Sequence, residues 1–455
     1  MAWHWRAHRR RCACNLNWIQ GAEYGNSENS TGNRIFHGKS RALIMYIETP
    51  EKRYDLVVIG GGMVGTSFAC ALCSEIGGKQ LSILVVEAFP QGAGKAQQPS
   101  FDARSTALSY GSRCIYDEIG LWRELSNQVT PIKEIHVSDK GHFGLTRLNH
   151  IEHDVEALGY VVENRQLGSV LNNEVKNSPA IQMISPAQVE QIRPTSGSMQ
   201  LAISRGESIF TIEASLVVLA EGGKSMICDQ LGIDRVVDDY NQHALIANIA
   251  FEKPHKNVAY ERFTDTGPLA ILPLESFDGE NRGCLVWTVA TNQSDEIQAM
   301  GTSALTKLLM DRFGNRLGKI THIGERFGYP LTLSIAKEQI RPGLVLLGNV
   351  AHTLHPVAGQ GLNLALRDTM VLVSRLGQAV RESESLGSMT VLQDYVDRQS
   401  FDQQKTITFT DQLTRIFSNN QRGRVLARKL GLLSIELIPP LRRGFAEQAM
   451  GLGSR

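Results

Sequence analysis

The stretch Asp55–Leu72, "DLVVIGGGMVGTSFACAL", passes from an apolar run through a glycine-rich turn into a segment with helical character. Leu56–Ile59 is short and β-branched, as is typical of a strand buried on both faces. Gly60, Gly62 and Gly65 then form G-x-G-x-x-G. In this pattern the first glycine permits a tight turn, the second lets backbone approach a pyrophosphate, and the third lets the helix pack closely on the strand. The stretch therefore predicts a strand–turn–helix corner whose helix N-terminus binds phosphate.

A second apolar run, Leu81–Ala88, contains Glu87, which lies 22 residues after Gly65. An acidic side chain at this distance is suited to accept hydrogen bonds from ribose hydroxyls. The corner and Glu87 together indicate a dinucleotide site, and the alternative is an ordinary turn between a strand and a helix. Both NAD and FAD use this unit, so the pattern does not choose between them.

Bulk composition limits the classes of function. The chain has 455 residues, enough for two or three domains, and is 42% hydrophobic, which suffices for full cores. Its formal charge of +1 does not favour nucleic-acid binding. No apolar run approaches the ~20 residues of a membrane-spanning helix.

The seven cysteines show neither metal-ligand spacing nor a dense disulfide framework, and we expect no metal site. Cys70 and Cys73 form C-x-x-C, which is either redox-active or one packed face of a helix. We favour packing, in a reducing cytoplasm.

The two ends of the chain differ from its centre. Residues 1–45 carry seven basic and two acidic residues and precede the first strand signal, so we expect a disordered extension or a start placed upstream of a true initiator at Met45. The segment Arg424–Phe445 mixes an apolar stripe with basic residues. It either lies on a membrane or a lipid-carrying partner, or packs on the core with a solvated basic face.

Two later apolar runs, Leu216–Leu219 and Leu344–Leu347, also end at glycines. We interpret them as parallel strands whose carboxyl ends meet at the ligand-binding edge of a sheet. A helical pattern begins near Gly359–Gly361, so a second positive helix end should face the same cleft.

At these residues the chain resembles the aromatic-ring hydroxylases, which are single-component FAD monooxygenases of the p-hydroxybenzoate hydroxylase type. The likeness runs from Tyr54 to the C-terminus and is carried by Gly60–Gly65, Asp102–Ser109 ("DARSTALS"), Glu221–Ser225 ("EGGKS") and Gly348–Asn363 ("GNVAHTLHPVAGQGLN"). Glu221 and Asn349 stand where the family has Asp, and Asn still donates and accepts hydrogen bonds but adds no charge. Glu261–Leu274, Arg316–Leu331 and Gly348–Leu364 resemble the branch of the family that serves ubiquinone biosynthesis.

The resemblance implies an α/β fold with a Rossmann-like FAD-binding domain, interleaved with a β-sheet substrate domain and followed by C-terminal helices. We expect the FAD-binding domain to comprise residues 52–130, 155–233 and 336–390, and the substrate domain residues 131–154 and 234–335. Residues 391–455 should form the helical region.

The implied activity is hydroxylation of a polyprenylated phenol of the 2-octaprenyl-6-methoxyphenol type, with O2 and with NAD(P)H as co-substrate, through a C4a-hydroperoxyflavin. The alternatives are a sister hydroxylase of the pathway that acts at another ring position, and a non-catalytic FAD-bound assembly subunit. The implied location is cytoplasmic. Peripheral association with the inner membrane or with a ubiquinone-biosynthesis complex is left open.

The resemblance also implies roles for individual residues. Pro356 and His355 are the candidate catalytic residues, and His355, like His352, is either a base for a phenol proton or a group that orients the loop. We favour loop orientation for His352 and leave His355 open. The expected cofactor-binding residues are Gly60, Gly62, Gly65, Glu87, Arg104, Arg165, Glu221, Asn349, Gly359, Gln360, Gly361 and Asn363.

Overall fold

A computed structural model describes residues 52–77, 81–90, 102, 104–139, 145–264, 267–417 and 438–452. The expected extension, residues 1–45, lies outside this range, as does most of the basic tail, residues 424–437. None of the described helices combines the length and apolar character needed to cross a bilayer.

The first sheet has a parallel centre. Its main path is β17 (Ile340–Arg341), β18 (Leu344–Leu346), β11 (Ser208–Leu219), β1 (Arg53–Ile59), β2 (Ile83–Val86) and β8 (Ile181–Ile184). Strand β1 lies between β11 and β2 and is parallel to both. Its residues Leu56–Val58 are fully buried, as the apolar run predicted. An antiparallel extension is formed by β9 (Gln188–Pro194) and β10 (Met199–Arg205).

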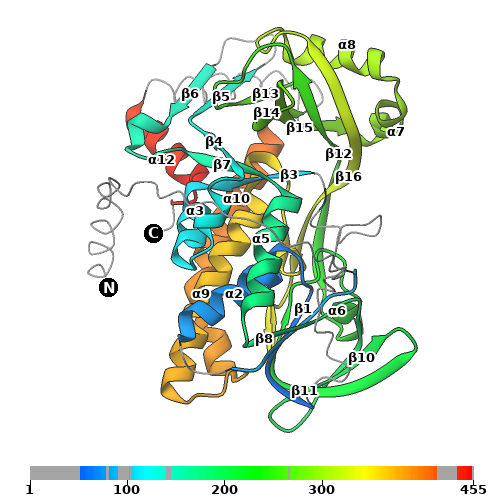
Figure 1. Ribbon diagram of the computed structural model, residues 1–455, viewed down its shortest axis with the longest axis vertical. Coiled ribbons are helices and arrows are strands. Elements are labelled where there is room, and N and C mark those ends of the chain that lie inside the picture. The colour runs from blue at the N-terminus through cyan, green and yellow to red at the C-terminus, as the bar shows by residue number, and fades with distance from the viewer. Residues whose placement is uncertain are drawn as a thin grey trace, which may run out of the picture. The chain divides into compact units, whose positions relative to one another are not determined.

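Helices α2 (Met63–Ile76), α5 (Asn164–Asn177) and α9 (Gln360–Glu382) lie side by side in Figure 1. Their apolar stripes pack with Leu56 and Val58 in one core. The shorter helices are α3 (Tyr110–Glu118), α4 (Trp122–Leu125) and α6 (Met226–Gln230). Cys70 and Cys73 on α2 belong to this core, and burial raises the pKa of both thiols. This placement favours packing over redox chemistry, because the reactive form of cysteine is the thiolate.

The second sheet is mostly antiparallel. Its order is β19 (His352–Thr353), β16 (Ile320–Ala336), β12 (Arg235–Phe251), β15 (Glu280–Ala290), β14 (Pro268–Phe277), β13 (Val258–Phe263), β5 (Glu134–Asp139) and β6 (Leu145–Asn149). Helices α7 (Thr291–Ala299) and α8 (Thr302–Phe313) pack against it, around the buried Trp287. Figure 1 shows β12 and β16 as the two longest strands of this sheet.

The predicted α/β class and the interleaving of the two sheets are confirmed, because β5 and β6 come from a segment between strands of the other sheets. The residue boundaries of the two domains stay a prediction. Strand β19 comes from residues 336–390 and nevertheless extends the second sheet.

A small third sheet joins β3 (Ser105–Ser109), β7 (Gly159–Glu163) and β4 (Val129–Ile132). The described residues also include the short 3₁₀ turns η2 (His150–His153), η3 (Gly348–Val350) and η4 (Val357–Gly359). The chain continues into α10 (Met389–Phe417), and the last described helix is α12 (Pro439–Ala449).

Candidate active site

The first corner of the site is the glycine turn between β1 and α2. Gly60 has φ of 104°, and a Cβ there would lie 2.5 Å from the carbonyl oxygen of Ala220, which directly follows the neighbouring strand β11. A Cβ on Gly65 would lie 2.0 Å from the Gly60 carbonyl oxygen, so only glycine lets α2 start this close to β1. Gly62 is the N-cap of α2, and no side chain caps the helix there. The first-turn N–H groups of α2 are therefore available to an anion.

Glu87 supplies the polar end of the same corner. Its carboxylate accepts hydrogen bonds from the backbone N–H of Gly61 (2.7 Å) and of Phe89 (2.8 Å), and the residue is 3% exposed. Because these bonds hold the carboxylate at the end of β2, Glu87 lies where a ribose would be recognised.

Glu221 and Asn349 follow the other two central strands of the sheet. The Ser225 hydroxyl donates to the Glu221 carboxylate, and burial raises the pKa of Glu221. Asn349 is exposed, while its carbonyl oxygen accepts from the Thr353 hydroxyl at 2.9 Å. Both positions therefore reach the carboxyl edge of the sheet.

The loop Pro356–Gly359 leads into α9. The Gly359 N–H donates to the Pro356 carbonyl at 2.9 Å, and Gly359 then adopts φ of 60° as the N-cap of α9. No side chain caps α9, and no acidic residue lies in its first turn. A second helix N-terminus with free donors is thus built beside the loop.

The side chain of Asn363, in the first turn of α9, forms hydrogen bonds with other residues of the protein. Its side-chain oxygen accepts from the Ser109 N–H (2.8 Å) and the Ser112 hydroxyl (2.6 Å). Its amide nitrogen donates to the carbonyls of Ala107 (3.0 Å) and Gly359 (2.6 Å). These four bonds fix the start of α9 against β3, so Asn363 positions the loop.

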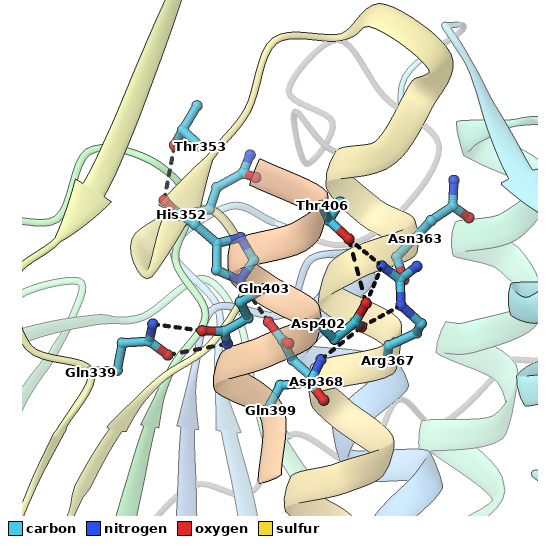
Figure 2. A network of polar contacts seen from close by, with 11 residues as sticks. Gln339, His352, Thr353, Asn363, Arg367, Asp368, Gln399, Asp402, Gln403 and Thr406 are labelled. Carbon is cyan, nitrogen blue, oxygen red and sulfur yellow. Dashed lines mark hydrogen bonds and ion pairs between the residues drawn. The ribbon is translucent and has the colours of Figure 1, made fainter. Parts of the chain in front are cut away.

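Figure 2 shows how α10 holds α9 in place. The Arg367 guanidinium pairs with the Asp402 carboxylate, with Nε–Oδ2 at 2.6 Å, and also donates to the Thr406 hydroxyl at 2.9 Å. Arg367 donates as well to the Asn363 carbonyl at 3.3 Å. The buried pair therefore connects α10 to the turn of helix that carries Asn363.

The two histidines of the loop are buried, and neither lines the cavity described below. His352 and Asp368 are both buried and are joined by a bond of 2.6 Å from Nε2 to Oδ2. His355 is 1% exposed, and its Nδ1 accepts from the Val357 N–H at 3.1 Å. Burial lowers the pKa of His355 to about 4, so the ring is neutral at physiological pH.

Arg104 and Arg165 differ in placement. The Arg104 guanidinium pairs with Asp102 at 2.5 Å and lies 4.7 Å from the Tyr329 ring centroid. Arg165 is exposed and pairs with Glu163 at 2.6 Å, while its backbone N–H donates to the Asp102 carbonyl.

One cavity of about 1030 Å³ brings most of these residues together. Ten of the predicted site residues line it: Gly60, Gly62, Glu87, Arg104, Glu221, Asn349, Pro356, Gly359, Gly361 and Asn363. Gly65, Arg165, His355 and Gln360 do not line it, although Gly65 shapes the corner as described above. The assignments of cofactor-binding and catalytic roles stay predictions.

The cavity continues past Pro356 onto an apolar wall. This wall is formed by the second sheet and by the helices α10 and α12, with Val137, Ala270, Leu272, Val286, Phe409 and Phe445 among its residues. Glu261 also lines it, and sequence reasoning assigned Glu261 no role. No local pattern marked it, because Glu261 stands between Tyr260 and Arg262 and its place on the wall follows from the pairing of its strand with β5 and β14.

A second cavity of about 1170 Å³ lies between α10 and α12. Phe409, Gln412 and Phe445 border both cavities. At its outer side the second cavity is lined by the exposed Phe401 and Leu441.

The polar half of the first cavity fits an adenine dinucleotide that carries a flavin. Two helices without side-chain caps, α2 and α9, begin beside it, and Glu87 is fixed at its edge. Helix N-termini favour the charge of a pyrophosphate and of a reduced flavin. An extended molecule could therefore reach from Gly60 to Gly361.

Comparison with known proteins supports this interpretation. Residues 53–409 match the family model described as "FAD binding domain". The ubiquinone hydroxylase UbiL of Rhodospirillum rubrum is 34% identical over 402 residues, which cover 88% of this chain and 90% of that protein. The 3-demethoxyubiquinol 3-hydroxylase of Escherichia coli is 29% identical and is matched over 98% of its length.

Solved structures agree on the fold. The p-nitrophenol 4-monooxygenase PnpA of Pseudomonas putida superposes with a TM-score of 0.72 at 16% identity, covering 89% of this chain and all of that one. The matched domain and the relatives together show that FAD is the cofactor. This chain belongs to the FAD binding domain family and, within it, to the FAD-dependent monooxygenases that act as ubiquinone-biosynthesis hydroxylases.

Proposed function

We propose that this protein hydroxylates the aromatic ring of a polyprenylated phenol of the 2-octaprenyl-6-methoxyphenol type, with O2 and NAD(P)H. The observation that carries the proposal is the single cavity of about 1030 Å³, which has a polar dinucleotide end and an apolar end on either side of Pro356. A flavin ring bound near Pro356 would face a guest held on the apolar wall.

Bound FAD supplies the oxygen-transfer chemistry, and this chain's own residues bind, orient and exclude water. Glu87 and the N-termini of α2 and α9 hold the dinucleotide. Pro356 stiffens the loop and offers its carbonyl but no N–H. The wall of Ala270, Leu272 and Val286 keeps water from the reacting centre.

The size and chemistry of the two cavities support a lipid-tailed phenol. A substituted phenol suits the apolar wall of the first cavity, and the cavity between α10 and α12 suits a hydrocarbon tail. Burial of apolar surface provides about 0.8 kcal/mol for each CH₂ group, so a prenyl tail can bind through the burial of its apolar surface, without polar contacts.

The test incubates the purified FAD-loaded protein with NADH or NADPH and 2-methoxy-6-prenylphenol. We expect substrate-dependent oxygen uptake and a product heavier by one oxygen atom, measured by electrode and mass spectrometry. Oxygen uptake that yields only hydrogen peroxide, with no change in the phenol, would contradict the proposal.

Two alternatives remain within the same family. A hydroxylase that acts at another ring position would give a product of the same mass, and NMR of the product separates the positions. The quinone intermediate that accumulates in a deletion strain identifies the natural step. A non-catalytic FAD-bound subunit would bind FAD but consume no NAD(P)H with any prenylated phenol.

A further inference from the structure

Glu261 is a carboxylic acid on the apolar wall of the cavity. It lies near the centre of β13, opposite Val137 on β5 and opposite Ala270 on β14. Alternation along the strand turns Glu261 to the cavity with Ala259 and Phe263. Its neighbours Tyr260 and Arg262 contact Phe313, with a ring centroid distance of 5.6 Å for Tyr260 and an Nη1–O distance of 3.2 Å for Arg262, although Tyr260 also borders the cavity.

The Glu261 carboxyl makes no hydrogen bond and no ion pair with another residue in the described part of the chain. Facing helices α10 and α12 contribute Phe409, Gln412 and Phe445 to the cavity, none of which ionises. Ala270, opposite Glu261 on β14, does not ionise either. Glu261 is half-buried and borders the cavity, where it is the acid on an otherwise apolar stretch of wall, so its carboxyl is free to bond a ligand held there.

The electrostatic environment of Glu261 agrees with this reading. Its surface borders the cavity, and burial alone raises its pKa to about 7. The nearest acid on β5 by register is Asp139, opposite Phe263, and Asp139 acts on the guanidinium of Arg262. Among the described residues that line the cavity, Glu87, Arg104, Glu221 and Lys224 belong to other elements, and none of them contributes to the shift. A carboxyl with a pKa near the working pH is suited to take up and return a proton.

We propose that Glu261 is a catalytic residue that accepts the phenol hydroxyl of the substrate and holds its proton while the ring is attacked. This inference rests on the proposed function. When the proton moves from the phenol oxygen to the carboxylate, electron density on the ring rises at the positions ortho and para to that oxygen. One oxygen atom of O2 adds to the ring carbon as a hydroxyl group. The two electrons of NAD(P)H, delivered through FAD, reduce the second oxygen atom, which leaves as water with the proton displaced from that carbon and one further proton. Glu261 then returns its own proton to the phenol oxygen and ends the cycle unchanged.

The test compares Glu261→Gln with Glu275→Gln, which makes the same change on an exposed residue of β14. We expect Glu261→Gln to lower kcat for hydroxylation about 10²–10⁴-fold, the usual contribution of a general base. FAD absorbance and affinity should stay unchanged, and NAD(P)H oxidation should be diverted to hydrogen peroxide. The rate of the unmodified protein should fall as pH drops through about 7, and the variant should lose this pH dependence. Glu275→Gln should behave as the unmodified protein does.

A binding measurement separates failure of this inference from failure of the proposed function. The perturbation of the flavin spectrum reports the affinity for 2-methoxy-6-prenylphenol and for its methyl ether, whether or not turnover follows. The unmodified protein should bind the phenol at least about tenfold tighter than the ether, because only the phenol donates to a charged acceptor. Glu261→Gln should remove most of that preference. Equal discrimination in the two proteins, or a variant with unchanged kcat and pH profile, would overturn the role of Glu261.

Discussion

Replacing Asp402 with Ala should destabilise the protein strongly, because it leaves the Arg367 guanidinium charged and buried. The Arg367 side chain is 6% exposed. In the variant it loses contacts of 2.6 and 3.4 Å to the carboxylate and keeps those to Thr406 and Asn363. Removing one partner of a buried ion pair costs about 3–5 kcal/mol, so we expect the free energy of unfolding to fall by that amount.

Urea unfolding of the FAD-free proteins, followed by circular dichroism, measures the loss, so that a difference in FAD affinity does not enter the comparison. Asp397→Ala is the matched control, since Asp397 is an exposed carboxylate of the same helix and its removal should change stability by less than about 0.5 kcal/mol. The double variant Arg367→Met and Asp402→Leu should recover most of the loss, because it buries no unpaired charge.

A loss below about 1 kcal/mol for Asp402→Ala would refute this reasoning, as would a double variant no more stable than the single one. FAD affinity should fall in parallel, since the same pair fixes the turn of α9 that carries Asn363. An unchanged FAD affinity with a large loss of stability would show that α9 keeps its position without the pair.

Four further predictions concern the two halves of the cavity. Gly65→Ala should lower the free energy of unfolding by at least about 1–3 kcal/mol and release FAD. Gly301→Ala, whose Cβ would meet nothing within 4 Å, should have neither effect. Thermal unfolding measures the stability, and absorbance at 450 nm measures the bound FAD. Glu87→Ala should weaken FAD binding by about 1.5–3 kcal/mol, the value of hydrogen bonds to a charged group, as measured by flavin fluorescence. Burial raises the pKa of Glu261 to about 7, so the protonated carboxyl contributes fully to the free energy of unfolding below about pH 4.5, and this contribution is lost as pH rises to 7. Between these two pH values the free energy of unfolding of the substrate-free protein should fall by up to about 3 kcal/mol relative to that of Glu261→Gln, as measured by urea unfolding. His355→Ala removes the acceptor of a backbone N–H and should weaken FAD binding without altering the pH profile of hydroxylation; a collapse of turnover at intact FAD affinity would instead make His355 the base.

The parallel sheet and its ligand edge could be predicted from the sequence because their signals are local. Strand β1 ends in a four-residue apolar run before a glycine turn, and α9 begins at the glycines that predicted it. The distance between Gly65 and Glu87 likewise reflects one strand–helix–strand unit.

The features that no local pattern revealed depend on tertiary packing. Arg367 and Asp402 lie 35 residues apart in segments rich in charge, and nothing in the sequence marks this pair as buried. Glu261 stands between Tyr260 and Arg262, so its surroundings read as an exposed strand. Its position on an apolar wall follows only from the pairing of β13 with β5 and β14. His355 shows the reverse case, since its motif left open a role as a base and the fold buries it without making it part of the cavity lining.

The three side chains shared by the two cavities, Phe409, Gln412 and Phe445, bear on which quinones this fold can serve. If small rotations of these side chains join the two spaces, a long isoprenoid keeps its head group inside while its remote units extend beyond the protein. Selection would then act on the ring substituents and on the first isoprene units only. The number of further units would be set by the enzyme that attaches the tail, and a single hydroxylase sequence would work in cells that make quinones of different lengths.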